Sequence, residues 1–140
     1  MSTTTHNVSI VKQCFAEALR GNRAGLEEIL APDYVIHIPD DYAGVDGLLG
    51  MVGVFKSALP DMGVTVDHQF ADGDYVASRF TVRGTHDGEL FGAAPTNRQV
   101  VMTGIALSRC EDGRIAEEWE QVDAVGLLQQ IGLLPAVAPA

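Results

Sequence analysis

The spacing of apolar residues changes at Pro60, and this change limits the fold more than any other feature of the sequence. Before Pro60 the apolar residues recur at intervals of about three to four, which is the spacing of amphipathic helices. After Pro60 they alternate with polar residues, which is typical of strands that bury one face. The pattern therefore predicts an α+β fold, with helices packed on one face of a curved, mainly antiparallel sheet.

The element boundaries follow from residues that start or stop regular structure. Three helices are expected before the sheet: one ending at Gly21, one between the cap Asn22 and Pro32, and one from Val45 to before Pro60. Strands are expected over residues 33–39, 64–71, 75–86, 99–110 and 115–122, with a loop over 87–98 and a closing helix from about Asp123. A curled sheet with helices on its open side encloses a pocket, where small ligands commonly bind.

Composition and charge limit the number of domains and the classes of molecule that the chain can bind. No repeat or linker divides the chain, so a single domain over residues 1–140 is expected, with a flexible Ala/Pro-rich tail over about 133–140. The net charge of −10 comes without a basic stripe, which argues against a nucleic-acid partner. No apolar run approaches the roughly 20 residues of a membrane span, and no secretory signal opens the chain. Cys14 and Cys110 lie far apart, so free thiols in a reducing, cytoplasmic setting are expected.

The segment "EEWEQVDAVGLLQQIG", residues 117–132, holds the only tryptophan and four acidic residues. Strand alternation places its residues and the preceding two on two faces: Ile115, Glu117, Trp119, Gln121 and Asp123 on one, and Ala116, Glu118, Glu120 and Val122 on the other. A solvated edge strand and the wall of a polar pocket both explain this pattern. An exposed indole would leave a large apolar area in water, and if Trp119 points inward, strand alternation takes Glu117, Gln121 and Asp123 inward with it.

The candidate site residues each have a structural interpretation beside the functional one. Asp123 stands where a helix cap is needed, and the same carboxyl could serve a pocket. Glu117 is either a solvated glutamate or a hydrogen-bonding group of the pocket. Arg79, in the middle of a strand, is expected to pair with a carboxylate such as Glu117, in a structural or a substrate-binding role. His37 lies in a strand and His86 borders the glycine-containing loop over 87–98, and either could be structural.

The sequence lacks the motifs of several common catalytic and cofactor-binding sites. It contains no GxSxG turn, no phosphate-binding loop, no GxGxxG motif and no cysteine and histidine cluster suited to zinc. What remains is acid–base chemistry by histidine and aspartate, with no metal and no cofactor expected.

Four short motifs together resemble the SnoaL-like polyketide cyclases, within the group of folds like nuclear transport factor two and ketosteroid isomerase. They are Gly84-Thr85-His86-x-Gly88, Gly92-x-x-Pro95-Thr96, Asp112-Gly113-Arg114-Ile115-x-Glu117-x-Trp119, and Asp123 before the closing helix. The resemblance implies a cone-shaped pocket lined by the face of Trp119, Glu117 and Asp123. It also implies a lyase or isomerase type of reaction on a small hydrophobic carbonyl substrate. It implies that Asp123 is the general acid–base, which removes a proton from a carbon between carbonyls before an intramolecular aldol closure.

The resemblance also leaves alternatives. Some of these cyclases carry a histidine in the strand that here reads Ile105-Ala106-Leu107, so His37 and His86 are the candidates to replace it. Epoxide hydrolysis by an Asp–Arg–Asp set, with Arg79 and Asp123, is a second enzyme hypothesis. A non-catalytic ligand-binding domain is a third. Homodimer formation is expected through the sparsely charged strands at 76–82 and 99–108.

Overall fold

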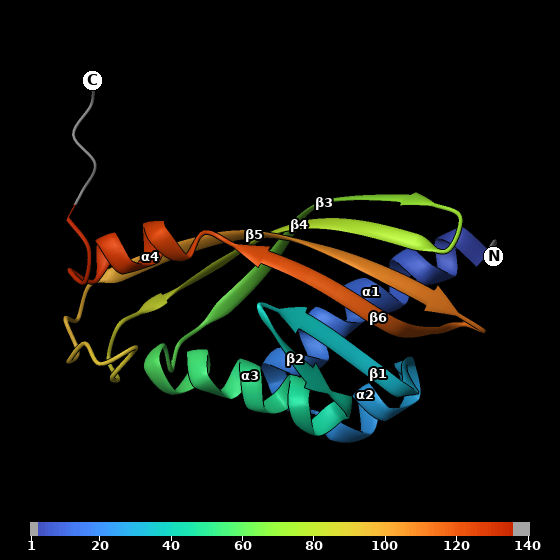
Figure 1. The fold of residues 1–140 in the computed structure, drawn as a ribbon, viewed down its shortest axis with the longest axis horizontal. Helices are drawn as coiled ribbons and strands as arrows, with labels where there is room; N and C mark the ends of the chain where they lie inside the picture. The colour runs from blue at the N-terminus through green and yellow to red at the C-terminus, as the bar shows by residue number, and fades with distance from the viewer. Residues whose placement is uncertain (1–2, 136–140) are drawn as a thin grey trace.

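Four helices and one six-stranded sheet form the part of the chain, residues 3–135, that the computed structural model describes (Figure 1). The helices are α1 (Thr3–Arg20), α2 (Arg23–Ile29), α3 (Gly44–Ala58) and α4 (Ala124–Gln130). The strands are β1 (Leu30–Ile38), β2 (Asp40–Ala43), β3 (Gly63–Asp72), β4 (Tyr75–Thr85), β5 (Gln99–Glu111) and β6 (Arg114–Val122). The predicted α+β class, with three N-terminal helices and a curved sheet, is confirmed, and β1 and β2 lie between α2 and α3.

The sheet has the strand order β2-β1-β6-β5-β4-β3. All neighbouring strands are antiparallel except β1 and β6, which run parallel. The order places β1, which lies between two helices in the sequence, beside the last strand of the chain. The N-terminal helical segment is thereby tied to the C-terminal half of the sheet.

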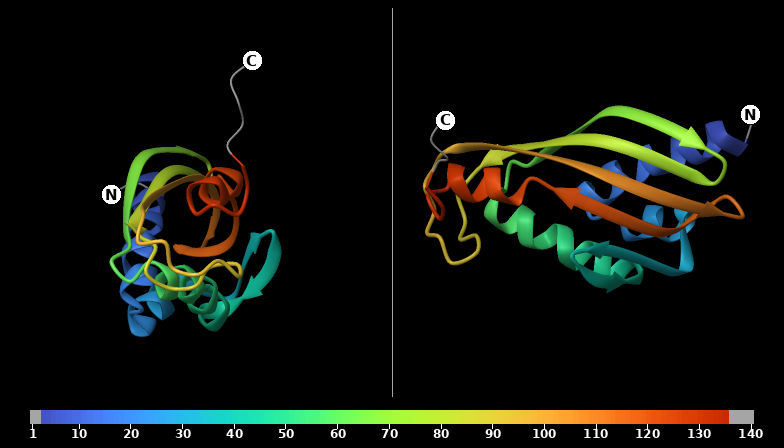
Figure 2. Two further views of the ribbon diagram at one scale, coloured as in Figure 1. Left: turned by 90° about the vertical axis from the view of Figure 1, so that its left-hand side faces the viewer. Right: turned by 45° about the horizontal axis from the view of Figure 1, so that its top comes forward.

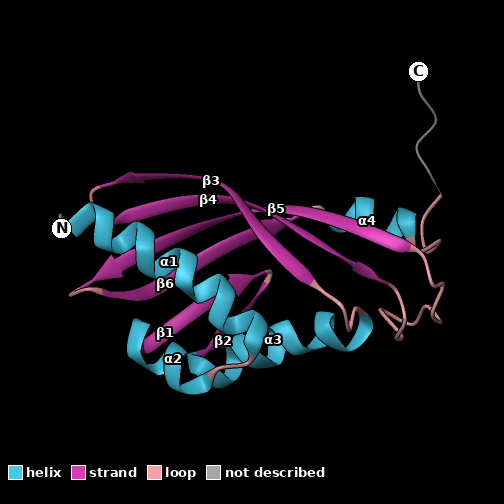
Figure 3. Ribbon diagram, turned by 180° about the vertical axis from the view of Figure 1, so that it is seen from behind, coloured by secondary structure: helices cyan, strands magenta, loops and turns pink. Residues whose placement is uncertain are grey.

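Helices α1 and α3 close one side of the curved sheet, and neither of them lies on the opposite side (Figures 2 and 3). Helix α1 turns Ile10, Val11, Cys14 and Ala18 inward, as its three-to-four spacing predicts. These residues join a core with Leu26 and other apolar side chains of α2, α3 and β1. A second apolar cluster lies around Phe80, Met102 and Leu127. The face of the sheet that turns away from α1 and α3 is called the outer face below.

Two expected boundaries near the first strand were wrong. Asn22 does cap α2, since its side chain accepts a hydrogen bond from the backbone N–H of Gly25 at 3.2 Å. The helix ends at Ile29, however, and Pro32 lies within β1, because Leu30 already pairs with the last strand. The pairing register shifts between Leu30 and Val35, and proline fits such an irregular stretch because it has no N–H to donate. The short edge strand β2 was not expected.

The remaining expectations concern the tail of the chain, its two cysteines and membrane-spanning helices. Residues 136–140 of the expected flexible tail lie outside the described part, while Leu133 donates a backbone hydrogen bond of 2.9 Å to Leu128. Cys14 and Cys110 are buried free thiols, as predicted. Among residues 3–135, none of the helices combines the length and the apolar character that a membrane crossing requires.

Two glycines offer a matched test of the packing. A Cβ at Gly104 of β5 would lie 2.5 Å from the ring of Phe80 and 2.8 Å from the carbonyl oxygen of Gln121, whereas a Cβ at Gly50 of α3 meets nothing within 4 Å. We expect Gly104→Ala to lower the free energy of unfolding by roughly 1–3 kcal/mol through overpacking. Gly50→Ala should raise it by roughly 0.5–1 kcal/mol, since alanine favours the helix. Urea denaturation of both variants measures the difference, and equal stabilities would contradict this packing.

Candidate functional site

A cavity of about 90 Å³ lies between the inner face of the sheet and helices α1 and α3. Most of its lining is apolar, and this part consists of Cys14, Phe15, Ala18, Leu19, Ile36, Ile38, Leu48, Met51, Val52, Phe55, Met62, Val64, Phe80, Val82, Met102 and Val122. The two acidic lining residues are Glu118 and Glu120 of β6. An apolar cavity with a few converging polar groups is the usual form of a small-molecule site.

Glu120 is the carboxyl of the cavity that lacks a hydrogen-bond partner among the described residues. Among the described residues, no hydrogen-bond donor or ion-pair partner is in contact with its side chain. Burial in apolar surroundings, followed by the charge of Glu118, raises its pKa to about 8. A carboxyl in this range can hold a proton near neutral pH and release it slightly above, which suits a group that transfers protons.

Glu118, two residues earlier on the same face, has hydrogen-bond partners on both carboxyl oxygens. One oxygen accepts a hydrogen bond of 2.6 Å from the Tyr34 hydroxyl, and the other accepts one of 2.5 Å from the Ser108 hydroxyl. Burial raises the pKa of Glu118, while the two hydroxyl donors act in the opposite direction. Burial and the neighbouring Glu118 likewise raise the pKa of Tyr34 well above its usual value. We infer that Glu118 is held in place and influences Glu120 chiefly through its charge.

The expected orientation of the Trp119 face was wrong. Trp119 is 37% exposed and lies on the outer face, and neither it nor Glu117 or Gln121 is among the residues that line the cavity. The cavity is lined instead by the alternate residues of β6. The assumption that the indole must avoid water failed because Trp119 stacks on the His37 ring, with ring centres 5.6 Å apart and planes at 25°.

On the outer face His37 lies between two carboxylates. Its Nδ1 is 2.6 Å from Asp41 and its Nε2 is 2.7 Å from Glu117. The hydrogen bonds to Asp41 and Glu117 raise the pKa of His37. Arg109 also lies 3.5 Å from Glu117. No group of three or more His, Cys, Asp and Glu side chains within residues 3–135 is arranged to hold a metal ion.

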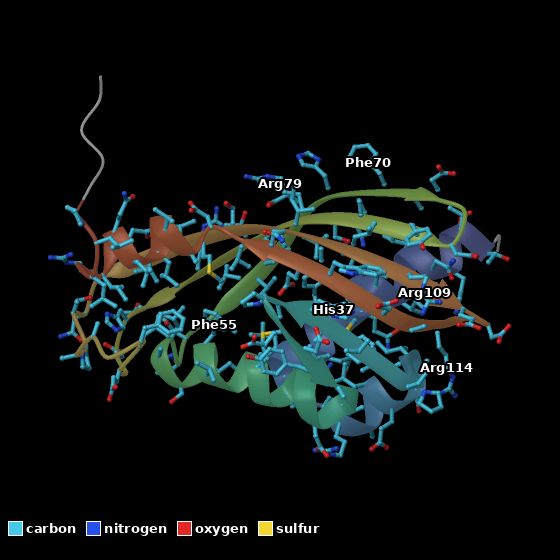
Figure 4. The ribbon with its side chains drawn as sticks, in the orientation of Figure 1. His37, Phe55, Phe70, Arg79, Arg109 and Arg114 are labelled. Carbon is cyan, nitrogen blue, oxygen red and sulfur yellow. The ribbon has the colours of Figure 1, made fainter. Side chains whose placement is uncertain are left out.

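Arg79 has a different partner from the one expected. It pairs at 3.0 Å with Asp67, which also accepts a hydrogen bond of 2.6 Å from Thr81, and it does not contact Glu117. Figure 4 shows its side chain, like that of Phe70, pointing away from the helices. Arg79 is not a lining residue, so the arginine of the epoxide-hydrolase hypothesis lies outside the cavity.

His86 is fully buried but does not line the cavity. Its Nδ1 accepts a hydrogen bond from the backbone N–H of Thr96 at 3.3 Å and lies 3.0 Å from the Thr96 hydroxyl. Its backbone also bonds to Arg98 and Asn97, so His86 closes the base of the loop over 87–98. Its Nε2 is buried without a hydrogen-bond partner among the described residues.

Asp123 is the N-cap of α4. Its carboxylate accepts a hydrogen bond of 2.9 Å from the backbone N–H of Gly126, and the residue is exposed. The cap interpretation is confirmed. Asp123 is not among the lining residues, and the structure brings it together with neither His37 nor His86 through any hydrogen bond or ion pair of the described residues. The catalytic roles of Asp123, His37 and His86 stay predictions.

Sequence reasoning missed Glu120 because it chose the wrong face of β6. A signal was present: the alternate face carries Ala116 and Val122, both small or apolar, around its two glutamates. Residues of that face stand opposite Ala106 and Ser108 of β5, which are buried as well. When apolar residues flank glutamates on the same face of a strand, that face is more consistent with the inside of the sheet than with solvent.

Comparison with known proteins agrees with this fold. The family model for the SnoaL-like polyketide cyclases matches residues 9–131. IdmH from Streptomyces antibioticus, a candidate polyketide cyclase, is 34% identical, with a TM-score of 0.81 over 90% of this chain and 98% of that one. AclR from Streptomyces galilaeus, a candidate hydroxylase, is 27% identical, with a TM-score of 0.83 over 96% and 86%.

A candidate SnoaL-like polyketide cyclase from Jannaschia sp. CCS1 has a TM-score of 0.83 at 23% identity, over 96% of this chain and 97% of that one, which supports the fold alone. Comparison with curated proteins gave no significant match. The names of IdmH and AclR also differ in the chemistry they indicate. The reaction of the present chain therefore has to be argued from its own cavity.

The partly buried Glu120 carboxyl makes a prediction about stability and pH. A carboxyl whose pKa is raised in the folded state contributes stability below its unfolded pKa of about 4.3, and this contribution is lost as pH rises toward about 8. Glu120→Gln removes the ionisation, so we expect it to exceed the wild type by roughly 2–5 kcal/mol in free energy of unfolding at pH 9 and to equal it near pH 4. Urea denaturation across this range measures both.

The exposed Glu89→Gln variant controls for the loss of one surface charge. A difference between Glu120→Gln and the wild type that stays constant from pH 4 to pH 9 would show that the pKa of Glu120 is not raised in the folded state.

Proposed function

Because the chain belongs to the SnoaL-like polyketide cyclase family, we propose that it is a cofactor-independent enzyme of the cyclase or isomerase type. Its substrate would be a small, hydrophobic molecule with neighbouring carbonyl groups, bound in the cavity under α1 and α3. The observation that carries the proposal is the Glu120 carboxyl, which has no hydrogen-bond partner among the described residues and lies in a mostly apolar lining. Glu120, rather than Asp123, is the group that we propose as the acid–base.

The chemistry needs a single carboxyl that takes and returns one proton. Glu120 in its ionised form removes a proton from the carbon between two carbonyls, and the electron pair of that C–H bond becomes an enolate. The enolate carbon then attacks a second carbonyl carbon of the same molecule, forming a C–C bond and an alkoxide. The proton held by Glu120 neutralises the alkoxide, directly or through the substrate, which restores the carboxylate. Each proton and electron pair is accounted for without an added reactant.

The surroundings of Glu120 support this role. The apolar lining raises the pKa of Glu120 and so increases its basicity, since the ionised form is poorly solvated. Glu118 is a positioning residue in this scheme: it is anchored by Tyr34 and Ser108, and its charge adds to the rise in the pKa of Glu120. Phe15 and Phe80, whose ring centres are 5.1 Å apart, form part of the wall that would hold the substrate chain folded.

We also propose that the chain forms a homodimer through the outer face. Strand register aligns an outward row across five strands, from Phe70 through Ala77, Leu107 and Trp119 to His37. Phe70 is 74% exposed, and Ile105, two residues from Leu107 on the same face of β5, is 56% exposed. A contiguous apolar strip of this kind marks an association surface, and a two-fold partner would cover it with an identical strip.

The remaining proposal concerns the cellular compartment. Cys14 and Cys110 are both buried and unpaired, which supports a reducing compartment such as the cytoplasm.

Proton exchange offers a test that needs no knowledge of the natural substrate. In deuterated buffer, ethyl benzoylacetate, an aryl β-keto ester, exchanges the hydrogen between its carbonyls, and proton NMR follows the rate. We expect wild-type protein to accelerate the exchange, with a rate that rises with pH until about pH 8, where Glu120 is ionised. Glu120→Gln should lose roughly 10²-fold or more of this acceleration, the usual scale for general acid–base catalysis.

Asp123→Asn separates the two carboxyl candidates. Asparagine caps a helix about as well as aspartate, so this variant should fold and keep the exchange rate. If Asp123→Asn loses the acceleration and Glu120→Gln keeps it, the assignment of Glu120 is wrong and the sequence-based assignment of Asp123 is right. If neither changes it, the cavity is not a carboxylate acid–base site.

Sedimentation equilibrium at micromolar concentration tests the dimer. We expect wild-type protein to be dimeric and Ile105→Glu to be monomeric, because the interface would have to remove water from the added carboxylate. Val54→Glu is the matched control, since Val54 is 53% exposed on α3, away from the outer face, and should leave the dimer intact. A monomeric wild type, or an Ile105→Glu dimer of unchanged affinity, would contradict this surface.

A further inference from the structure

The charges of the cavity are of one sign. Its lining includes Glu118 and Glu120 and, among the described residues, no lysine, arginine or histidine. Lys56 of α3, which could be expected to compensate them, donates its ammonium hydrogen bond to the backbone carbonyl of Leu19 at 2.6 Å. An anionic ligand would therefore enter a site that holds carboxyl groups and offers no cation, which is costly in apolar surroundings.

The two carboxyls are not equivalent toward a ligand. Both oxygens of Glu118 already accept hydrogen bonds, from Tyr34 and Ser108. Glu120 has no such partners within the described part of the chain, although it borders the same cavity. The group that can still form a strong interaction with a ligand is the carboxyl of Glu120. Its complement is a hydrogen-bonding neutral group or, in the ionised state, a cation.

The remainder of the lining suits the body of an organic cation. Phe15, Phe55 and Phe80 all line the cavity, and aromatic faces attract a desolvated cation. Met51 and Met102 contribute flexible, polarisable thioethers that adapt to the outline of a ligand. An ammonium group beside Glu120 and an apolar tail against these walls would satisfy both parts of the cavity.

We propose that the cavity binds hydrophobic amines in their protonated form, with the ammonium group paired to the Glu120 carboxylate and the apolar part against the aromatic and aliphatic walls. The inference rests on the proposed function only in taking this cavity as the ligand site. It adds a ligand class, and it predicts that such amines compete with the neutral carbonyl substrate.

Few other titratable groups face Glu120. Glu118 precedes it on β6, Cys14 faces it from α1, and Tyr34 of β1 lies behind Glu118. Burial and the two glutamates keep the pKa of Cys14 well above its usual value, so its thiol stays neutral. The lining residues from α3, β3, β4 and β5 are all uncharged. The ionisation of Glu120 is therefore the step that an incoming cation has to drive.

Isothermal titration calorimetry with three ligands of one skeleton tests this proposal: 3-phenylpropylamine, 3-phenyl-1-propanol and 3-phenylpropanoate. The affinity for the amine should rise about tenfold per pH unit from pH 6 to near pH 8, since Glu120 must lose its proton. It should then stay level until about pH 10, where an aliphatic amine loses its charge. The alcohol should show no such rise, and the anion should bind at least tenfold more weakly than the amine at pH 8.5.

Glu120→Gln should lose at least tenfold of the affinity for the amine at pH 8.5 and the pH dependence with it, while it keeps the affinity for the alcohol. The exposed Glu89→Gln variant is the control for net charge and should match the wild type. The proposal is overturned if the amine does not bind at about 10 mM, if it binds Glu120→Gln equally well, or if the anion binds as tightly.

These outcomes are independent of catalysis, because binding is measured without turnover. A cavity that ignores the amine while Glu120→Gln abolishes proton exchange would leave the proposed function standing and end the amine proposal. Amine binding that depends on Glu120, together with exchange that does not, would lead to the opposite conclusion.

Discussion

The parallel pairing of β1 with β6 is the constraint on which the rest of this structure depends. It joins a strand that follows the second helix to the last strand of the chain, and so holds the helical layer over the sheet. On the inner side it brings the Tyr34 hydroxyl to Glu118. On the outer side it brings His37 to Glu117 and Trp119. Two of the three glutamates of β6, one on each face, thus obtain a partner from the same neighbouring strand.

The inner face shows how two similar carboxyls acquire different properties two residues apart. Glu118 is anchored by two hydroxyl groups, which offset part of the cost of burying it. Glu120 has no such compensation within the described residues, and its pKa rises to about 8. A protein selected for stability alone would place an apolar residue there. A carboxyl without a partner in an apolar cavity is therefore better explained by chemistry than by packing.

The outer face has a separate organisation around ion pairs and exposed apolar side chains. Arg79 pairs with Asp67, and Arg109 lies near Glu117, so the charged residues of this face satisfy one another beside the apolar strip. Helix α4 is held at the end of the sheet by Asp123, its cap, and by Gln130, whose amide exchanges two hydrogen bonds of 2.8 Å with the backbone of Val101. The residues that the sequence placed in one pocket are thus divided among the outer face, the cap of α4 and the base of the loop over 87–98.

The sequence by itself determined the class of fold, because the change from helical to alternating spacing at Pro60 and the capping residues Asn22 and Asp123 act locally. It also determined that Glu117 and Trp119 share one face of a strand and Glu118 and Glu120 the other. It could not determine which face is inside, since both mix carboxylates with apolar residues. The tertiary structure decided this, because the neighbour of β6 is β1, a strand about 80 residues away in sequence that no local pattern identifies. Its His37 stacks on the indole outside, its Tyr34 binds Glu118 inside, and Glu120, on the same side as Glu118, faces the cavity.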